Sequence, residues 1–205
     1  MPDRPRVVLA TGNRGKLREF AAMAAQTGLQ LVPQSDFGIE PPEETGRTFL
    51  DNALIKARHA AELSGLPAMA DDSGLEVDAL EGAPGVYSAR YAGVGASDAA
   101  NLARLLQALA AVPTAARRAR FRCVIAFVRT ADDLEPIVGT GSWEGTILSA
   151  PRGEGGFGYD PVFAPLDTLG VAELVGSSVA EWPAELKNRH SHRSRALHAL
   201  LSNWR

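Results

Sequence analysis

The chain has 205 residues, of which 45% are hydrophobic and 22% are charged, and its formal net charge is −3. This composition is typical of a soluble globular protein, and the net charge does not provide the positive field that attracts a nucleic-acid polymer. The single cysteine, Cys123, excludes an internal disulfide framework, and no apolar run approaches the roughly 20 residues of a membrane span. Residues 1–6 lack the apolar core of a secretory signal, so we expect a cytoplasmic protein with no membrane partner.

The first half of the chain alternates short strands with helices. Apolar, β-rich segments predict strands at residues 6–10, 29–32 and 66–70. Apolar residues at helical spacing predict a short helix over residues 17–24 and a longer one over residues 48–63, where either Thr45 or Thr48 is the expected cap.

Longer strands dominate the second half. Ser97 is placed to cap a leucine-rich helix. Residues 120–128 and 137–147 are strand candidates, and the Asp-rich stretch between them predicts a hairpin turn. A last helix is expected after Ser191. This order of elements predicts an α/β or α+β sheet protein that forms a single domain over residues 1–205.

Two adjacent acids, Asp71 and Asp72, follow the predicted strand 66–70. Carboxylates at the end of a buried strand need a compensating cation, and Mg²⁺ prefers carboxylate oxygens. The alternative is a solvated turn in which the acids and Ser73 cap backbone groups. Neighbouring side chains of an extended segment take opposite faces, so we expect Asp72 to take part in chemistry and Asp71 to make structural contacts.

A glycine-containing turn, Thr-Gly-Asn-Arg-Gly-Lys, lies between the first predicted strand and helix, over residues 11–16. Such a turn directs backbone N–H groups and the positive end of a helix at an anion, and Lys16 adds a charge. The short glycine spacing and Leu17 exclude a Walker A loop. The alternative is an ordinary strand-to-helix turn.

Two more candidates lie on and before the longer helix. Glu44 precedes the helix, and we interpret it as a second carboxylate for the metal of Asp72; the alternative is an acid that stabilises the helix end. Lys56 lies on a polar stripe of the helix. It is either a phosphate ligand or a solvated lysine.

The segment from Gly155 to Pro161 combines closely spaced glycines with two aromatic residues. It is not a dinucleotide-binding turn, because Pro161 and a β-like segment follow it instead of a helix. Glycines that let the backbone approach a flat ligand, beside a ring that can stack, suit a nucleobase. A core aromatic residue in a tight turn is the alternative.

A donor-rich cluster of Lys187, His192 and Arg193 precedes the last helix. Arg193 only donates hydrogen bonds, so it suits phosphate or the 6-keto oxygen of a purine. The spacing of His190 and His192 alone is weak support for a transition-metal site, since no cysteine or other third ligand accompanies it.

Together these blocks resemble the Ham1/RdgB-type inosine triphosphate pyrophosphatases over residues 7–201. Each motif is only moderately specific, but their order and spacing together are highly specific. The motifs that carry the resemblance are Thr11–Lys16, Glu43–Gly46, Asn52–Ala53, Lys56–Ala57, Ala70–Leu75, Gly82–Tyr91, Gly156–Pro161 and Ser191–Arg193.

The resemblance implies an α/β fold with a curved mixed sheet, flanking helices and two lobes that enclose a nucleotide cleft, and also a homodimer that depends on Mg²⁺. The implied reaction is hydrolysis of noncanonical purine nucleoside triphosphates (ITP, dITP and XTP) to the monophosphate and pyrophosphate, which cleanses the nucleotide pool. By motif match, Asp72 is the general base and shares the metal with Glu44. The implied triphosphate ligands are Thr11, Gly12, Asn13, Arg14, Gly15, Lys16 and Lys56. The implied nucleoside and base ligands are Ser73, Phe157, Gly158, Tyr159, Asp160, Lys187, His192 and Arg193.

Two other functions remain open. A Maf-like pyrophosphatase acts on pyrimidine or modified nucleotides and would also use acids and a metal. A noncatalytic nucleotide sensor would bind ITP without needing carboxylates, so the presence of Glu44 and Asp72 argues against it.

Overall fold

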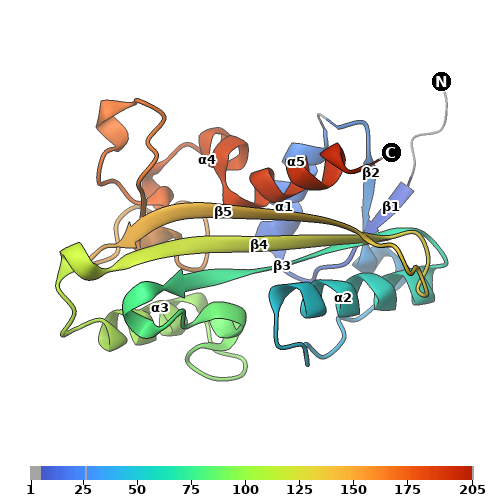
Figure 1. Ribbon diagram of the computed structural model, residues 1–205, viewed down its shortest axis with the longest axis horizontal. Helices are drawn as coiled ribbons and strands as arrows, with labels where there is room; N and C mark the ends of the chain where they lie inside the picture. Colours follow the sequence, from blue (N-terminus) through green and yellow to red (C-terminus); the bar gives the residue numbers. More distant parts are fainter. Residues whose placement is uncertain (1–5, 26, 205) are drawn as a thin grey trace. The chain divides into compact units, whose positions relative to one another are not determined.

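The computed structural model describes residues 6–25 and 27–204 (Figure 1). The strands are β1 (Arg6–Leu9), β2 (Gln30–Pro33), β3 (Ala68–Val77), β4 (Arg118–Val128), β5 (Ile137–Ile147) and β6 (Phe163–Pro165). The helices are α1 (Arg14–Ala24), α2 (Phe49–Ser64), α3 (Asp98–Ala108), α4 (Ala184–His190) and α5 (His192–Ser202). Among these described residues, no helix is long and apolar enough to cross a membrane.

The strands form one six-stranded sheet in the order β2-β1-β3-β4-β5-β6. Strand β1 pairs in parallel with β2 and with β3, so that Val8 lies opposite both Val32 and Ala68. Strands β5 and β6 are antiparallel. The mixed sheet with its helices confirms the predicted α/β class.

Strand β3 differs from the sequence prediction in its length. We expected a strand over residues 66–70, followed by the two acids, and an extended segment over residues 75–80. Strand β3 instead runs without interruption from Ala68 to Val77 and contains both Asp71 and Asp72, and a 3₁₀ helix follows at Asp78–Leu80. The physical reason is that both carboxylates have cationic partners, described below, so the strand does not have to end where the acids begin.

The chain divides into two compact units. The first unit contains the described residues up to Asp72, together with Cys123–Gly141 and the described residues from Arg193 onward. The second unit contains Ser73–Arg122 and Ser142–His192. The expected single domain with two lobes remains a prediction.

The core of the first unit has one cluster on each face of its strands. One cluster joins α1 and α5 to the sheet through residues such as Phe20, Met69 and Leu197. The other joins α2 to the sheet through small residues, among them Ala57 and Ala70. Figure 1 shows α2 on one side of these strands and α1 and α5 on the other. Cys123 is buried in the first cluster.

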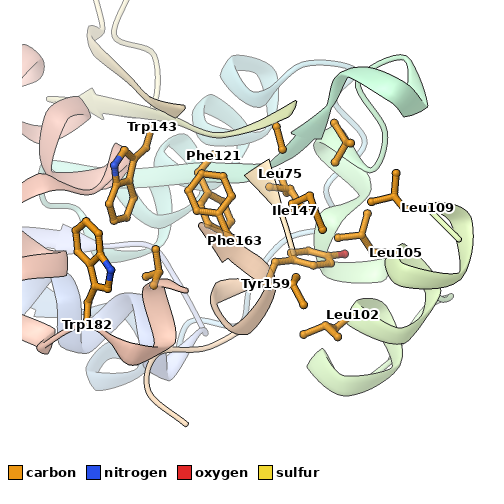
Figure 2. Close-up of a cluster of buried hydrophobic side chains, with 14 residues drawn as sticks. Leu75, Leu102, Leu105, Leu109, Phe121, Trp143, Ile147, Tyr159, Phe163 and Trp182 are labelled. Carbon is orange, nitrogen blue, oxygen red and sulfur yellow. The ribbon is translucent and has the colours of Figure 1, made fainter. Parts of the chain in front are cut away.

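The second unit has an aromatic-rich core (Figure 2). Phe121 and Phe163 pack with ring centroids 4.4 Å apart, and Trp143 meets Trp182 edge to face at 5.5 Å. The ring of Tyr159 lies in the same cluster, near leucines of α3. This packing fixes the ends of the loop that carries the predicted base-binding residues.

Candidate functional site

The two adjacent acids of β3 contact different elements. Asp71 Oδ2 lies 2.9 Å from Lys16 Nζ of α1 and 3.3 Å from Arg193 Nε of α5. Asp72 contacts Asn52 and Lys56, both on α2. The prediction that the two side chains take opposite faces of an extended segment is therefore confirmed, and a solvated turn is excluded because both acids are buried.

Lys56 joins two carboxylates that are far apart in the sequence. Its Nζ lies 2.7 Å from Glu44 Oε1 and 3.1 Å from Asp72 Oδ1. The lysine side chain is buried, which excludes the alternative of a solvated helix lysine. Thr48 caps α2 in a capping box with Asp51, so the helix that carries Lys56 begins at a fixed point. We call Glu44, Asn52, Lys56 and Asp72 the carboxylate–lysine cluster.

Asn52 orients the carboxylate of Asp72 and the loop that carries Glu44. Its Nδ2 donates to Asp72 Oδ2 at 3.1 Å, and its Oδ1 accepts the N–H of Gly46 at 2.8 Å. A Cβ atom on Gly46 would lie 2.5 Å from Asn52 Oδ1, so only glycine allows this approach. The side-chain amide thus ties β3 to the loop before α2.

The environment of the carboxylate–lysine cluster changes the pKa of Asp72 and of Lys56. Burial raises the pKa of Asp72 and the nearby charge of Glu44 adds to this, whereas Lys56 and Lys16 offset the rise only in part. For Lys56, burial alone would lower the pKa, but the charges of Asp72, Asp71 and Glu44 raise it overall. A lysine that stays charged thus faces a carboxylate that is more basic than usual.

The turn at residues 11–16 leads from β1 into the start of α1. Asn13 caps α1 by accepting the N–H of Lys16 at 3.0 Å, and its own N–H donates to Thr11 Oγ1 at 3.2 Å. Gly12, Asn13 and Arg14 are exposed. The positive end of α1 and the lysine side chain therefore belong to one turn, although Lys16 also binds Asp71.

Arg193 lies in a buried ionic cluster of the first unit. Its guanidinium binds Asp71 and Glu19, and it lies 5.9 Å from the centre of the Phe20 ring. Burial by itself would raise the pKa of Asp71, but the charges of Lys16 and Arg193 hold it well below its usual range. These contacts connect α1, β3 and α5. The predicted contact of Arg193 with a purine stays a prediction.

The predicted base-binding loop of the second unit is braced by charged groups. The carboxylate of Asp160 accepts the N–H of Phe157 at 2.9 Å and also binds Lys187 Nζ. The same Nζ lies 4.7 Å from the centre of the Phe157 ring. A Cβ atom on Gly156 would lie 2.0 Å from Asp160 Oδ2, so the loop needs a glycine there. The structure thus brings Phe157, Asp160 and Lys187 together.

Ser73 and His192 are two other predicted ligands of the second unit. Ser73 is half-buried within β3. His192 is buried and stacks on Phe121, with ring centroids 4.8 Å apart and planes at 14°. No described group of three or more His, Cys, Asp or Glu side chains is placed to hold a metal ion.

The donor set of Glu44 and Asp72 nevertheless fits Mg²⁺. Both carboxylates already converge on one compact cation, the ammonium group of Lys56. Mg²⁺ commonly takes only one or two protein carboxylates and completes its shell with water and substrate phosphates. Since the side chain of Glu44 is 27% exposed, one of the two carboxylates is accessible from solvent.

Sequence reasoning did not assign a site role to Asn52, Glu19 or Asp98. Asn52 carried a usable signal, because it lies four residues before Lys56 and therefore on the same face of a helix. Glu19 is an acid that α1 turns inward, and nothing in its local sequence predicts the pairing with Arg193. Asp98 contacts a loop 60 residues further along the chain.

Known proteins resemble this chain over nearly its whole length. Residues 7–203 match the model of the Ham1 family. The chain is 54% identical over 196 residues to a dITP/XTP pyrophosphatase of Thioalkalivibrio sulfidiphilus, covering 96% of both chains. It is 55% identical over 202 residues to that of Methylococcus capsulatus, covering 98% of this chain and 97% of the relative. Among solved structures, a HAM1 protein from Coxiella burnetii superposes with a TM-score of 0.85 at 44% identity, covering 98% of each chain.

Proposed function

Because the chain belongs to the Ham1 family, we propose that it hydrolyses dITP, XTP and ITP to the corresponding monophosphate and pyrophosphate. The observation that carries this proposal is the carboxylate–lysine cluster, in which a basic carboxylate and a charged lysine lie in direct contact. Such a pair offers a proton acceptor beside a phosphate ligand.

The first unit supplies the groups for the triphosphate in this proposal. The N–H groups at the start of α1 and the charges of Lys16 and Lys56 attract the phosphate oxygens. Both lysines are already held by carboxylates, at 2.9 Å from Asp71 for Lys16 and 2.7 Å from Glu44 for Lys56. They are therefore ordered before substrate binds, which lowers the entropic cost of binding.

Asp72 acts as the general base in the proposed mechanism. It accepts a proton from a water molecule as the water oxygen bonds to the α-phosphorus and the bond to the pyrophosphate leaving group breaks. Asn52 holds one oxygen of the carboxylate at 3.1 Å, so the side chain keeps one orientation.

Glu44 and Asp72 would hold Mg²⁺. When bound, the metal supplies positive charge that offsets the repulsion between acids and triphosphate and stabilises the leaving pyrophosphate. Lys56 contacts both carboxylates, so it is the residue whose position must adjust to such an ion.

The second unit supplies the groups for the nucleoside. Phe157 offers a ring face for a purine, and Lys187 and Asp160 brace it. Together with Ser73, Gly158, Tyr159 and His192 they form the proposed base-binding set of the second unit. In the proposal, Arg193 is a donor for a 6-keto oxygen of the purine. We also propose a homodimer in the cytoplasm, which light scattering and cell fractionation would test.

A substrate panel tests the function directly. The purified protein is incubated with Mg²⁺ and with dITP, XTP, ITP, GTP, dTTP or UTP, and pyrophosphate and orthophosphate are measured separately. We expect one pyrophosphate per monophosphate, with the highest kcat/KM for dITP, XTP and ITP, and no turnover in EDTA. Preferred hydrolysis of dTTP or UTP would support a Maf-like enzyme instead. Binding of ITP in EDTA without turnover in Mg²⁺ would support a sensor.

A further inference from the structure

Three successive residues of the loop that carries Phe157 are each bonded to a different partner. The N–H of Phe157 donates to Asp160 at 2.9 Å, that of Gly158 donates to Asp98 Oδ2 at 2.8 Å, and the hydroxyl of Tyr159 donates to the carbonyl of Ser88 at 2.9 Å. Asp160 lies within the loop itself, whereas Asp98 and Ser88 belong to other elements of the second unit. The backbone on both sides of the Phe157 side chain is therefore held.

The anchor at Ser88 is part of the buried framework. Its Oγ accepts the N–H of Leu75 at 2.9 Å and donates to the carbonyl of Gly85 at 2.6 Å, which ties the 3₁₀ helix Gly85–Arg90 to β3. Tyr159 is itself buried in the core of the unit (Figure 2). The Ser88 contact therefore stabilises the packing of the second unit as well as the loop.

The anchor at Asp98 is of a different kind. Asp98 is the first residue of α3 and is exposed, and its carboxylate reaches across 60 residues of sequence to the amide of Gly158. A helix needs no such contact, since Ser97 already caps α3 by accepting the N–H of Ala100 at 3.2 Å. Gly158 has a φ of 61°, a conformation that its neighbours must hold in place.

We infer that Asp98 is a positioning residue for purine recognition: it holds the Gly158 amide and thereby fixes the plane in which Phe157 meets the base. The inference rests on the proposed function, because it assumes that Phe157 stacks on the substrate. Loss of the contact leaves Asp72 and the phosphate-binding groups in place, so the effect falls on binding of the base and not on the chemical step.

The test uses three variants and two measurements. Asp98→Ala removes the acceptor, and Asp98→Asn keeps an oxygen that can accept the same N–H. Ser97→Ala is the matched control, because it weakens the same end of α3 without touching Gly158. Hydrogen exchange of the Gly158 amide is measured by NMR in the free protein, and kcat and KM are measured for dITP and GTP.

We expect Asp98→Ala to speed exchange at Gly158 and to raise KM for dITP about 3- to 10-fold with kcat changed less than about twofold. The ratio of kcat/KM for dITP to kcat/KM for GTP should decrease. Asp98→Asn should return the exchange rate at Gly158 and the KM for dITP most of the way to wild-type values. Ser97→Ala should leave that exchange rate and KM at wild-type values while lowering Tm.

Three results overturn the inference: wild-type exchange and KM in Asp98→Ala, no rescue by Asp98→Asn, or an equal rise of KM in Ser97→Ala. Failure of the proposed function is a separate outcome. In that case the wild-type protein does not hydrolyse dITP or XTP, while exchange at Gly158 still shows whether Asp98 holds the loop.

Discussion

Asn52 donates a hydrogen bond of 3.1 Å to Asp72, and its other side-chain atom accepts the N–H of Gly46 at 2.8 Å. Asn52 is fully buried, so neither bond can be replaced by water without rearrangement. One side chain on α2 thus orients the proposed general base and the loop that carries Glu44.

Replacing Asn52 by Ala should therefore reduce both stability and turnover. We expect the free energy of unfolding in urea to fall by about 1–3 kcal/mol, because a buried carboxylate oxygen and a backbone N–H lose their partner. We expect kcat for dITP to fall roughly 10-fold, because Asp72 is no longer held in one orientation. His59→Ala is the control: His59 is on the same helix but bonds to the carbonyl of Glu40 at 3.0 Å. Equal losses in both variants would contradict a specific role for Asn52.

Asp72→Asn tests the general base more directly. The substitution keeps the size of the side chain but removes the proton acceptor, and we expect kcat for dITP to fall about 10²- to 10⁴-fold. Pyrophosphate release measures the rate, and equilibrium binding of the product dIMP shows whether the nucleotide site is intact. A variant with turnover within threefold of wild type, roughly 0.7 kcal/mol in barrier height, would remove Asp72 from the mechanism.

The local parts of this structure were predictable and the buried ionic parts were not. Ser97 caps α3 as predicted, and Thr48, one of the two expected caps, caps α2, because a cap is defined by residues three positions apart. Strand β3 was predicted to stop at Ala70, because the cations that compensate its acids are distant in sequence. Arg193, for example, lies 122 residues beyond Asp71.

Helix α4 was missed for a related reason. It has only seven residues, no side-chain cap, and begins directly after Pro183, so neither periodicity nor capping identifies it. Its Lys187 is nevertheless buried against Asp160 and Phe157. The residue type and the neighbouring motif predicted a role for Lys187, but only the fold shows that the lysine braces the aromatic ring.

The pKa of Tyr159 predicts a loss of stability at alkaline pH. Burial raises the pKa of its hydroxyl well above the usual range, and Tyr91 and Asp98 add to the rise. The unfolded chain has a tyrosine pKa of about 10, so the protonated hydroxyl contributes its full stability below about pH 10 and loses it as the pH rises. We expect the free energy of unfolding to decrease by about 1.4 kcal/mol per pH unit above pH 10 from this group alone.

Urea unfolding between pH 8 and pH 11 measures this slope, by comparison of the wild-type protein with Tyr159→Phe. The variant should be less stable at pH 8, because the bond to the carbonyl of Ser88 is lost, but its stability should fall less steeply with pH. Tyr87→Phe, at an exposed tyrosine, is the control and should follow the wild-type curve. Parallel curves for Tyr159→Phe and wild type would show that Tyr159 does not cause the alkaline loss.

Comparing Gly156→Ala with Gly170→Ala should separate the effect of moving Asp160 in the base-binding loop from the effect of backbone strain. Gly156 has a φ of 74°, and a Cβ atom there would lie 2.0 Å from Asp160 Oδ2. Gly170 has the same φ of 74°, but a Cβ atom there would have no neighbour within 4 Å. Both alanine variants should lose about 1 kcal/mol of stability through backbone strain, measured by urea unfolding, and Gly156→Ala should lose more because its Cβ atom displaces the buried Asp160 carboxylate.

Only Gly156→Ala also displaces the carboxylate that binds the Phe157 amide and Lys187. We therefore expect a rise in KM for dITP of about 10-fold or more in Gly156→Ala and a wild-type KM in Gly170→Ala. If both variants keep the wild-type KM, the position of Asp160 does not govern substrate binding, and the proposal that the loop binds the base is wrong. If both raise KM equally, the cause is strain in the unit and not the clash with Asp160.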